Sequence, residues 1–164
     1  MPGRPDRPGT VEGMDSVYVP GPSFTPVDLE SVLALWDRPL DERADPAADF
    51  RRFYADPVPV NGVPVPAEGL VARAWALQAA FAERRTEVVH RVETADRLVI
   101  GFYMHVLHIG PYDTALGRVE ATGRRLRIRV NDILTIRHGL IADIWVMSDE
   151  ADLLRQLGRL PSSV

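Results

Sequence analysis

The sequence predicts an α+β domain in which helices cover one face of a curved antiparallel sheet. Between about residues 27 and 84, apolar residues recur with the spacing of amphipathic helices. From Glu87 onward they recur at every second position, as in strands with one buried face. A short segment with helix-start and helix-stop signals then closes the chain. Helices before strands, rather than alternating with them, are typical of α+β proteins.

Composition limits the chain to one compact domain and excludes several chemistries. Of 164 residues, 46% are hydrophobic, which is enough for one core but hardly for two. The net charge of −4, without an extended basic block, makes nucleic acid a poor partner. Since the sequence has neither cysteine nor lysine, it lacks thiol nucleophiles, thiolate metal sites, disulfides and side-chain Schiff bases. We expect no membrane span and no signal peptide, and therefore a cytoplasmic protein.

The domain is expected to begin near residue 27. Residues 1–26 contain six prolines and four glycines and few apolar groups, which predicts a disordered N-terminal extension. Residues 27–160 then form the folded domain.

Two helix starts follow in sequence. Thr25 as N-cap, Pro26 at the first helical position and an acid at Asp28 favour a first helix. Asp45 and Pro46 repeat this signal for a second, shorter helix.

A Pro-punctuated segment over residues 56–62 fits an edge strand or a loop, because proline cannot donate to a strand ladder. A third helix is predicted from about Ala67 to Arg84. Its apolar side contains Leu70, Val71, Ala74, Trp75, Gln78 and Phe81.

The strand patterns predict which histidines face the core. Alternation around Val88 and Val92 places His90 on the buried side. In the next strand Phe102, Met104 and His108 share the more apolar row, which leaves His105 outside. Residues 110–122 are read as a lid or, preferably, as a plain hairpin connection. Asp149 caps a last helix that Gly158 ends.

The segment from Arg124 to Trp145 carries the main functional hypothesis. A tight turn at His138-Gly139 would pair its two halves as a hairpin. Regular pairing places Ile136 opposite Ile141, Leu134 opposite Asp143 and Asp132 opposite Trp145. Asp132 and Asp143 then lie on the same apolar face, as diagonal neighbours about 7–8 Å apart. Burial raises the pKa of a carboxyl group, which suits it to proton transfer near neutral pH. The alternative is that both acids accept hydrogen bonds in a structural network. The second face of the last strand, with Leu140, Ala142, Ile144 and Val146, is also apolar and suggests a covered or dimeric surface.

The chain resembles the SnoaL-like polyketide cyclase family of the nuclear-transport-factor-2-like superfamily. The resemblance rests on the order and spacing of short segments across Val27–Gly158. These are Phe53-Tyr54-Ala55-Asp56, Ala80-Phe81, His108-Ile109-Gly110, Ala121-Thr122-Gly123-Arg124, Asp132-Ile133, Ile141-Ala142-Asp143-Ile144-Trp145, Asp149 and the segment from Leu153 to Gly158. It implies a cone-shaped hydrophobic pocket between sheet and helices, a homodimer, and cofactor-independent acid/base chemistry on a polyketide-like substrate.

We therefore expect a cyclase that closes a ring by an intramolecular aldol-type reaction, without cofactor or metal. The alternatives are an epoxide-opening cyclase or epoxide hydrolase, and a non-catalytic small-molecule binding module. The expected catalytic residues are His108, Asp132 and Asp143. The expected substrate-binding residues are Tyr54, Trp75, His90, Phe102, Met104 and Trp145.

Overall fold

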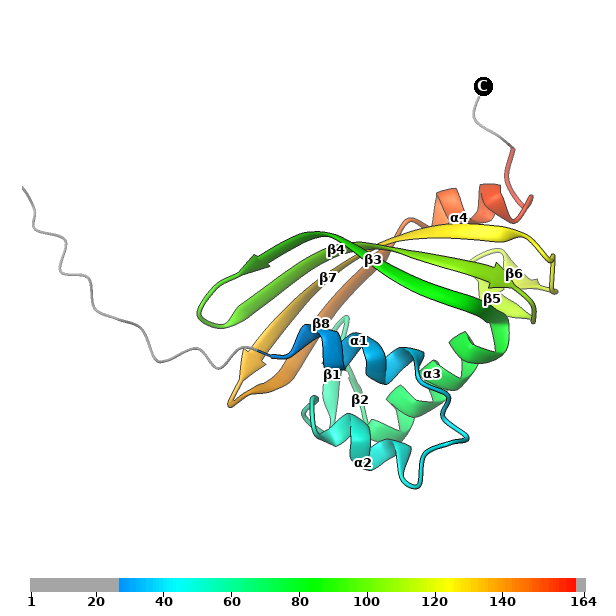
Figure 1. Ribbon diagram of the computed structural model, residues 1–164. Coiled ribbons are helices and arrows are strands. Elements are labelled where there is room, and N and C mark those ends of the chain that lie inside the picture. The colour runs from blue at the N-terminus through cyan, green and yellow to red at the C-terminus, as the bar shows by residue number, and fades with distance from the viewer. Residues whose placement is uncertain (1–26, 162–164) are drawn as a thin grey trace, which may run out of the picture.

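A long, curved sheet with helices beneath it organises the molecule (Figure 1). The computed structural model describes residues 27–161, so the predicted N-terminal extension and the Thr25-Pro26 start lie outside the described residues. The six strands of the main sheet lie in the order β2-β1-β8-β7-β4-β3. The expected α+β class is confirmed, with helices α1, α2 and α3 on one side of the sheet (Figure 1).

The sheet is mixed, whereas the sequence predicted an antiparallel one. Its strands and the small β5-β6 hairpin are β1 (Val58–Val60), β2 (Val63–Val65), β3 (Phe81–Glu93), β4 (Arg97–His108), β5 (Tyr112–Thr114), β6 (Gly117–Val119), β7 (Arg125–Arg137) and β8 (Leu140–Ser148). Strand β1 joins β8 in parallel through Val60 and Ile144. The chain enters β1 alongside the start of β8, where Tyr54 already forms a parallel bridge with Ile141.

Two of the predicted helix starts are confirmed, and the first is shifted. Helix α1 (Leu29–Asp37) begins one residue after Asp28, which is its N-cap and not, as predicted, an acid in its first turn. Asp45 caps α2 (Pro46–Arg51), which has Pro46 in its first turn. Asp149 caps α4 (Glu150–Gln156), whose end is followed by Gly158 at φ +75°. Each cap side chain accepts a backbone N–H that the helix itself leaves unpaired.

The third helix is shorter than predicted. Helix α3 (Ala67–Ala80) ends one residue before Phe81, where the backbone turns extended and β3 begins. The predicted helical register up to Arg84 is wrong because Phe81 already pairs with His108 of β4.

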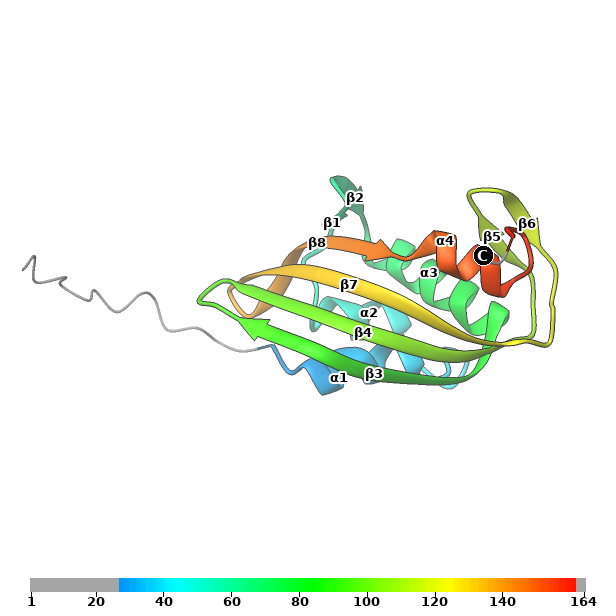
Figure 2. The ribbon, with the colours of Figure 1, turned by 90° about the horizontal axis from the view of Figure 1, so that it is seen from above.

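Alternation along β4 and β7 separates two faces of the sheet. The helix face is covered by α1, α2 and α3 and contains Leu98, Ile100, Phe102, Val106, Leu126, Ile128, Val130 and Leu134, all of them buried. The outer face contains Gly101, Tyr103, His105, Arg127 and Arg129. In Figure 2, seen from above, the strands β3, β4, β7 and β8 lie side by side over the helices.

One extra residue in β8 decides which side chains share the helix face. The predicted turn is present, with His138 at φ +52° and Gly139 at φ +76°, and Ile136 pairs with Ile141 as expected. The next pair is Thr135 with Asp143, so Ala142 has no partner and forms a β-bulge. A one-residue shift moves every following side chain to the other face.

The bulge contradicts three expectations for β8. Asp132 pairs with Val146 instead of Trp145, and Leu134 pairs with Ile144 instead of Asp143. Asp143 therefore lies on the outer face, and the predicted pair of acids on one face is wrong. The row of Ile144 and Val146, which we expected on the second face, lies on the helix face.

Helix α4 lies beside the free part of β7 (Figure 2). Strand β8 pairs with β7 only from Val130 onward. Beyond it, the Gln156 side chain accepts a hydrogen bond from the Arg127 N–H at 2.8 Å and donates one to the Arg127 carbonyl at 3.0 Å. The amide thus pairs with an exposed strand edge as a neighbouring strand would.

Candidate active site around Asp132

Asp132 is a carboxyl group on the helix face of the sheet, in an apolar row of β7. It stands between Ile100 of β4 and Val146 of β8. Its Oδ1 atom is buried and has no hydrogen-bond partner among the described residues. Burial without a compensating donor disfavours the carboxylate, and it raises the pKa of Asp132 to about 7. The group is therefore poised to take up or release a proton near neutral pH.

Tyr54 and Trp36 form a hydrogen-bonded pair of polar groups in the core. Tyr54 is only 5% exposed, and its hydroxyl accepts a 2.8 Å hydrogen bond from Nε1 of Trp36. Burial raises the pKa of Tyr54, the hydrogen bond from Trp36 opposes that rise, and the negative charge of Asp132 adds to it. The Trp36 ring also packs edge-on against Phe50, which fixes its position.

His108 is buried as predicted, at the end of β4. Its Nδ1 accepts a hydrogen bond from the Thr122 N–H at 3.3 Å and lies 2.9 Å from the Thr122 hydroxyl. In the neutral ring the hydrogen therefore resides on Nε2, which is buried and unpaired among the described residues. Burial lowers the pKa of His108.

The structure does not bring His108 together with Asp132. His108 pairs with Phe81, while Asp132 pairs with Ile100, eight residues earlier in β4. At about 3.3 Å per residue, the two positions are separated by about 26 Å along the strand. The predicted sharing of proton transfer between them does not fit this geometry.

The expected substrate-binding residues divide between the two sides of the sheet. Tyr54, Phe102 and Met104 lie on the helix side, together with Asp132. Trp145 is 52% exposed on the outer face, and Trp75 is 45% exposed on α3.

His90, which we expected on the buried side, is exposed. A bulge after Val88 shifts β3, so that His90 pairs with Gly101 on the outer face. A side chain at Gly101 would meet Asn131 and His90, so these two lie over the glycine. The bulge residue carries no turn signal in the sequence.

Sequence reasoning missed Trp36 as a site residue. It belongs to the apolar side of α1, and its helical spacing gave no sign that its N–H is directed at Tyr54. Only the packing of α1 on α2 sets that distance. The acidic residue in an otherwise apolar strand row, by contrast, did identify Asp132.

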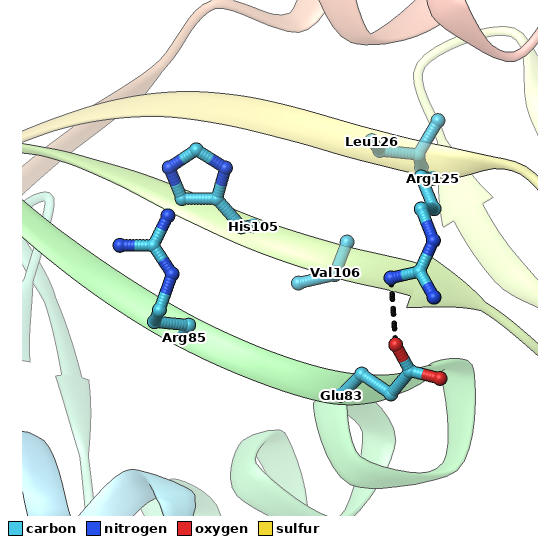
Figure 3. A pocket seen from close by; sticks show the side chains of 6 residues that line it. All are labelled: Glu83, Arg85, His105, Val106, Arg125 and Leu126. Atoms are coloured by element: carbon cyan, nitrogen blue, oxygen red, sulfur yellow. Dashed lines mark ion pairs between the residues drawn. The ribbon is translucent and has the colours of Figure 1, made fainter.

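A hollow of about 330 Å³ lies at the other end of the sheet (Figure 3). It is lined by Glu83, Arg85, His105, Val106, Arg125 and Leu126. Its charges are compensated, since Arg125 pairs with Glu83 at 2.6 Å and His105 lies 2.7 Å from Glu87. It contains neither Asp132 nor Tyr54, and its chemistry is that of a solvated surface.

Within residues 27–161, no group of three or more His, Asp or Glu side chains is arranged to hold a metal ion. None of the helices in this part of the chain has the length and apolar character needed to cross a membrane.

Comparison with known proteins identifies the family. Residues 33–157 match the model of the SnoaL-like polyketide cyclase family. The match spans most of the chain, and the protein belongs to this family. A search of curated proteins found no match.

Solved structures have the same fold. TsrD from Streptomyces laurentii is 25% identical, with a TM-score of 0.63 over 82% of this chain and 100% of that one. A SnoaL-like polyketide cyclase from Agrobacterium tumefaciens is 22% identical, with a TM-score of 0.64 over 82% of this chain and 100% of that one. Wild-type IdmH from Streptomyces antibioticus is 21% identical, with a TM-score of 0.58 over 79% and 97%.

Proposed function

We propose that this protein is a cofactor-independent cyclase that closes a ring in a polyketide or related natural-product intermediate, with Asp132 as the proton-transfer group. The single observation that carries the proposal is the buried, unpaired Oδ1 of Asp132, whose pKa is raised to about 7. Family membership supports the reaction class.

The proposed reaction is an intramolecular aldol closure. The Asp132 carboxylate removes a proton from the carbon next to a carbonyl, which leaves an enolate. The enolate carbon attacks a second carbonyl of the same molecule, so that a C–C bond forms and the second carbonyl oxygen becomes an alkoxide. The alkoxide then takes up a proton, which protonated Asp132 can return. A general base of matched pKa contributes typically about 10²–10⁴-fold to such a step.

The apolar surroundings favour the same chemistry. Phe102 and Met104 lie on the same face of β4, and Tyr54 is buried beside Ile141 of β8. Such a surface suits a planar, hydrophobic intermediate and can hold its two reacting carbons in contact.

The proposal is tested by solvent deuterium exchange, followed by NMR, at the acidic carbon of an aromatic 1,3-diketone, together with turnover of linear polyketide intermediates. Asp132→Asn is expected to lower both rates at least about 100-fold in a folded protein. Asp143→Asn is the matched control, because it removes the same charge from the outer face. Equal rates in wild type and Asp132→Asn would disprove the proposal.

The same experiment separates the alternatives. An epoxide-opening enzyme would convert epoxide substrates without exchanging carbon-bound protons. A binding module would bind polycyclic ligands with neither exchange nor turnover.

We propose further that the protein acts as a homodimer. The outer face carries an apolar group of side chains, which register places together at one end of the sheet. Its members are Val92, Val99, Ile133, Trp145 and Met147, and all of them except Val99 are 37–58% exposed. Exposed apolar patches of this kind are typical of association surfaces.

A further inference from the structure

We propose that residues 16–19 of this chain add a short strand to the free edge of β3, over residues 88–93. We call residues 16–19 the N-terminal segment and residues 88–93 the exposed half of β3. The N-terminal segment lies outside the described residues, whereas the edge that would receive it is fully described. The pairing concerns the edge of the sheet and does not rest on the proposed function.

Strand β3 has unpaired backbone groups along one side. It is the last strand in the order of the main sheet, with β4 as its only strand neighbour among residues 27–161. The Thr94 N–H donates to the Arg97 carbonyl at 2.9 Å, which makes these two residues a hydrogen-bonded pair. Because such pairs alternate along antiparallel strands, the N–H and C=O groups of Arg91 and Glu93 point away from β4. These groups can bond to a further strand.

The exposed half of β3 also presents apolar side chains to solvent. All of its residues are exposed, whereas Phe81, at the start of the strand, is buried. Val88 and Val89 are 38% and 47% exposed, and neither belongs to the apolar group that we propose as the dimer surface. A long, exposed and apolar strand edge invites pairing with other chains, and proteins commonly cover such an edge.

The described part of the chain begins beside this edge. Nη2 of Arg84, near the start of β3, donates to the carbonyls of Trp36 and Asp37 at 3.2 and 2.8 Å, which ties the end of α1 to β3. Helix α1 extends about 12 Å from there. Figures 1 and 2 show it beneath β3, with its first residues toward the end of that strand. Val27, just before α1, is buried, so the chain before it is attached to the core close to the exposed half of β3.

The N-terminal segment is the part of the preceding chain best suited to strand pairing. Val17, Tyr18 and Val19 are β-branched or aromatic, and no other three consecutive residues before Val27 are. Pro20 follows directly and would end the strand, because proline cannot donate to a strand ladder. The chain from Val19 to Val27 can span at most about 26–29 Å, whereas the exposed half of β3 is about 17 Å long.

The tether favours this segment over a second copy of the chain. A short linker holds a segment near its binding surface at an effective concentration on the order of millimolar. A second copy competes only at its own, lower concentration. The N-terminal segment is therefore the occupant that the geometry favours.

The added strand would lie in line with the candidate active site. Arg91 lies opposite Ile100, which lies opposite Asp132, so the edge is two strands, or about 10 Å, from Asp132. A strand on this edge extends the same row, and its alternate side chains join the helix face that holds Asp132.

The pairing is tested by amide hydrogen exchange of the full-length protein, followed by NMR. Val17→Pro and Tyr18→Pro are made separately, because only alternate N–H groups of a strand face its neighbour. At least one of the two is expected to raise the exchange rates of Arg91 and Glu93 about tenfold or more, since their amides lose their partners. Val11→Pro, which adds a proline outside the N-terminal segment, is the matched control and should leave these rates unchanged.

The amide of Leu134, in the middle of the sheet, is the internal reference. It should exchange equally in all these proteins, which shows that the substitutions leave global stability unchanged.

Two outcomes would overturn the pairing. Exchange of Arg91 and Glu93 in the wild-type protein as fast as in an unstructured peptide would show that the edge is uncovered. Protection of these amides that both proline variants leave unchanged would exclude the N-terminal segment, and a rise of that protection with protein concentration would assign the edge to a second copy.

Discussion

At the scale of single residues, burial disfavours the charged forms of two side chains, Asp132 and His108. Asp132 has no donor for its buried oxygen, and burial holds its pKa near 7. His108 has its Nδ1 paired with Thr122, and burial holds its pKa below the usual value. The first arrangement costs stability when the group is charged, and the second requires the group to stay neutral.

Asp132 should make the protein less stable as pH rises. Its pKa is raised from 3.8 to about 7 on folding, so between these values the folded state binds more protons than the unfolded state. Stability from this group is full below pH 3.8 and is lost as pH rises to about 7. Asp132→Asn should remove this loss, and the free energy of unfolding at alkaline pH should rise by on the order of 2–4 kcal/mol relative to wild type. Parallel pH profiles of urea unfolding for the two proteins would contradict this.

His108 should matter for folding. Its side chain is completely buried and orders the Thr122-Gly123-Arg124 segment, whose backbone also bonds to His108. His108→Ala should lower the free energy of unfolding by about 3 kcal/mol, as for other large-to-small substitutions in a core. His105→Ala, on the outer face, is the control and should cost less than about 1 kcal/mol.

The pH dependence of the His108 contribution has the opposite sign to that of Asp132. Because the folded-state pKa is lowered, this stability is full above the ordinary value of 6.5 and is lost as pH falls through the lowered value. Thermal unfolding of wild type and His108→Ala across the acidic range measures it. A stability difference that does not shrink on acidification would contradict the neutral state of the ring.

At the scale of elements, a turn and a bulge in the β7-β8 hairpin decide which side chains face the helices. The His138-Gly139 turn was predictable from its glycine, and the two adjacent positive φ values match a two-residue hairpin. The bulge at Ala142 was not, since an alanine in an apolar run gives no signal for an unpaired position. One residue therefore moved Asp143 and Trp145 from the predicted pocket to the outer face.

The contact between α4 and β7 gives a prediction at this scale. Gln156 pairs both backbone groups of Arg127, so Gln156→Ala leaves a strand edge without partners. We expect a loss of about 2 kcal/mol in the free energy of unfolding and faster amide exchange at Arg127. Arg155→Ala, one residue away and exposed, should change stability by less than about 0.5 kcal/mol. Equal effects of both substitutions would show that only helix propensity is involved.

At the scale of the whole molecule, one face of the sheet is covered by helices and the other is not. The outer face combines an apolar end near Trp145 with a charged end around Arg85, His105 and Arg127. The covered face holds Asp132, so the proposed chemistry and the proposed association surface lie on opposite sides of the same strands.

The dimer proposal predicts a clear effect of one tryptophan. Trp145→Glu places a charge within the apolar group, at its β8 end, and should convert the dimer to a monomer, as measured by analytical ultracentrifugation. Trp75→Glu is the matched control, because Trp75 is similarly exposed, 45% against 52%, but lies on α3. A monomeric wild-type protein, or an unchanged dimer in Trp145→Glu, would disprove the proposed interface.

The sequence by itself determined the class of fold, the helix starts at Asp45 and Asp149, the β7-β8 turn, and the inward direction of Asp132 and His108. These follow from local rules, namely capping chemistry, turn conformations and the two periods of apolar residues. The family was also recognisable from the order of short segments. The caps and the turn lie within a few neighbouring residues, whereas the fold class and the family rest on patterns along the whole domain.

Only the tertiary structure decided that Asp143, His90 and Trp145 face away from the helices, that His108 and Asp132 lie far apart, and that Trp36 reaches Tyr54. Bulges in β3 and β8 set the first group, because a shift of one residue exchanges the two faces of a strand. The other two depend on which residues lie opposite one another across strands and between helices. Such pairings join residues distant in sequence, and no local pattern encodes them.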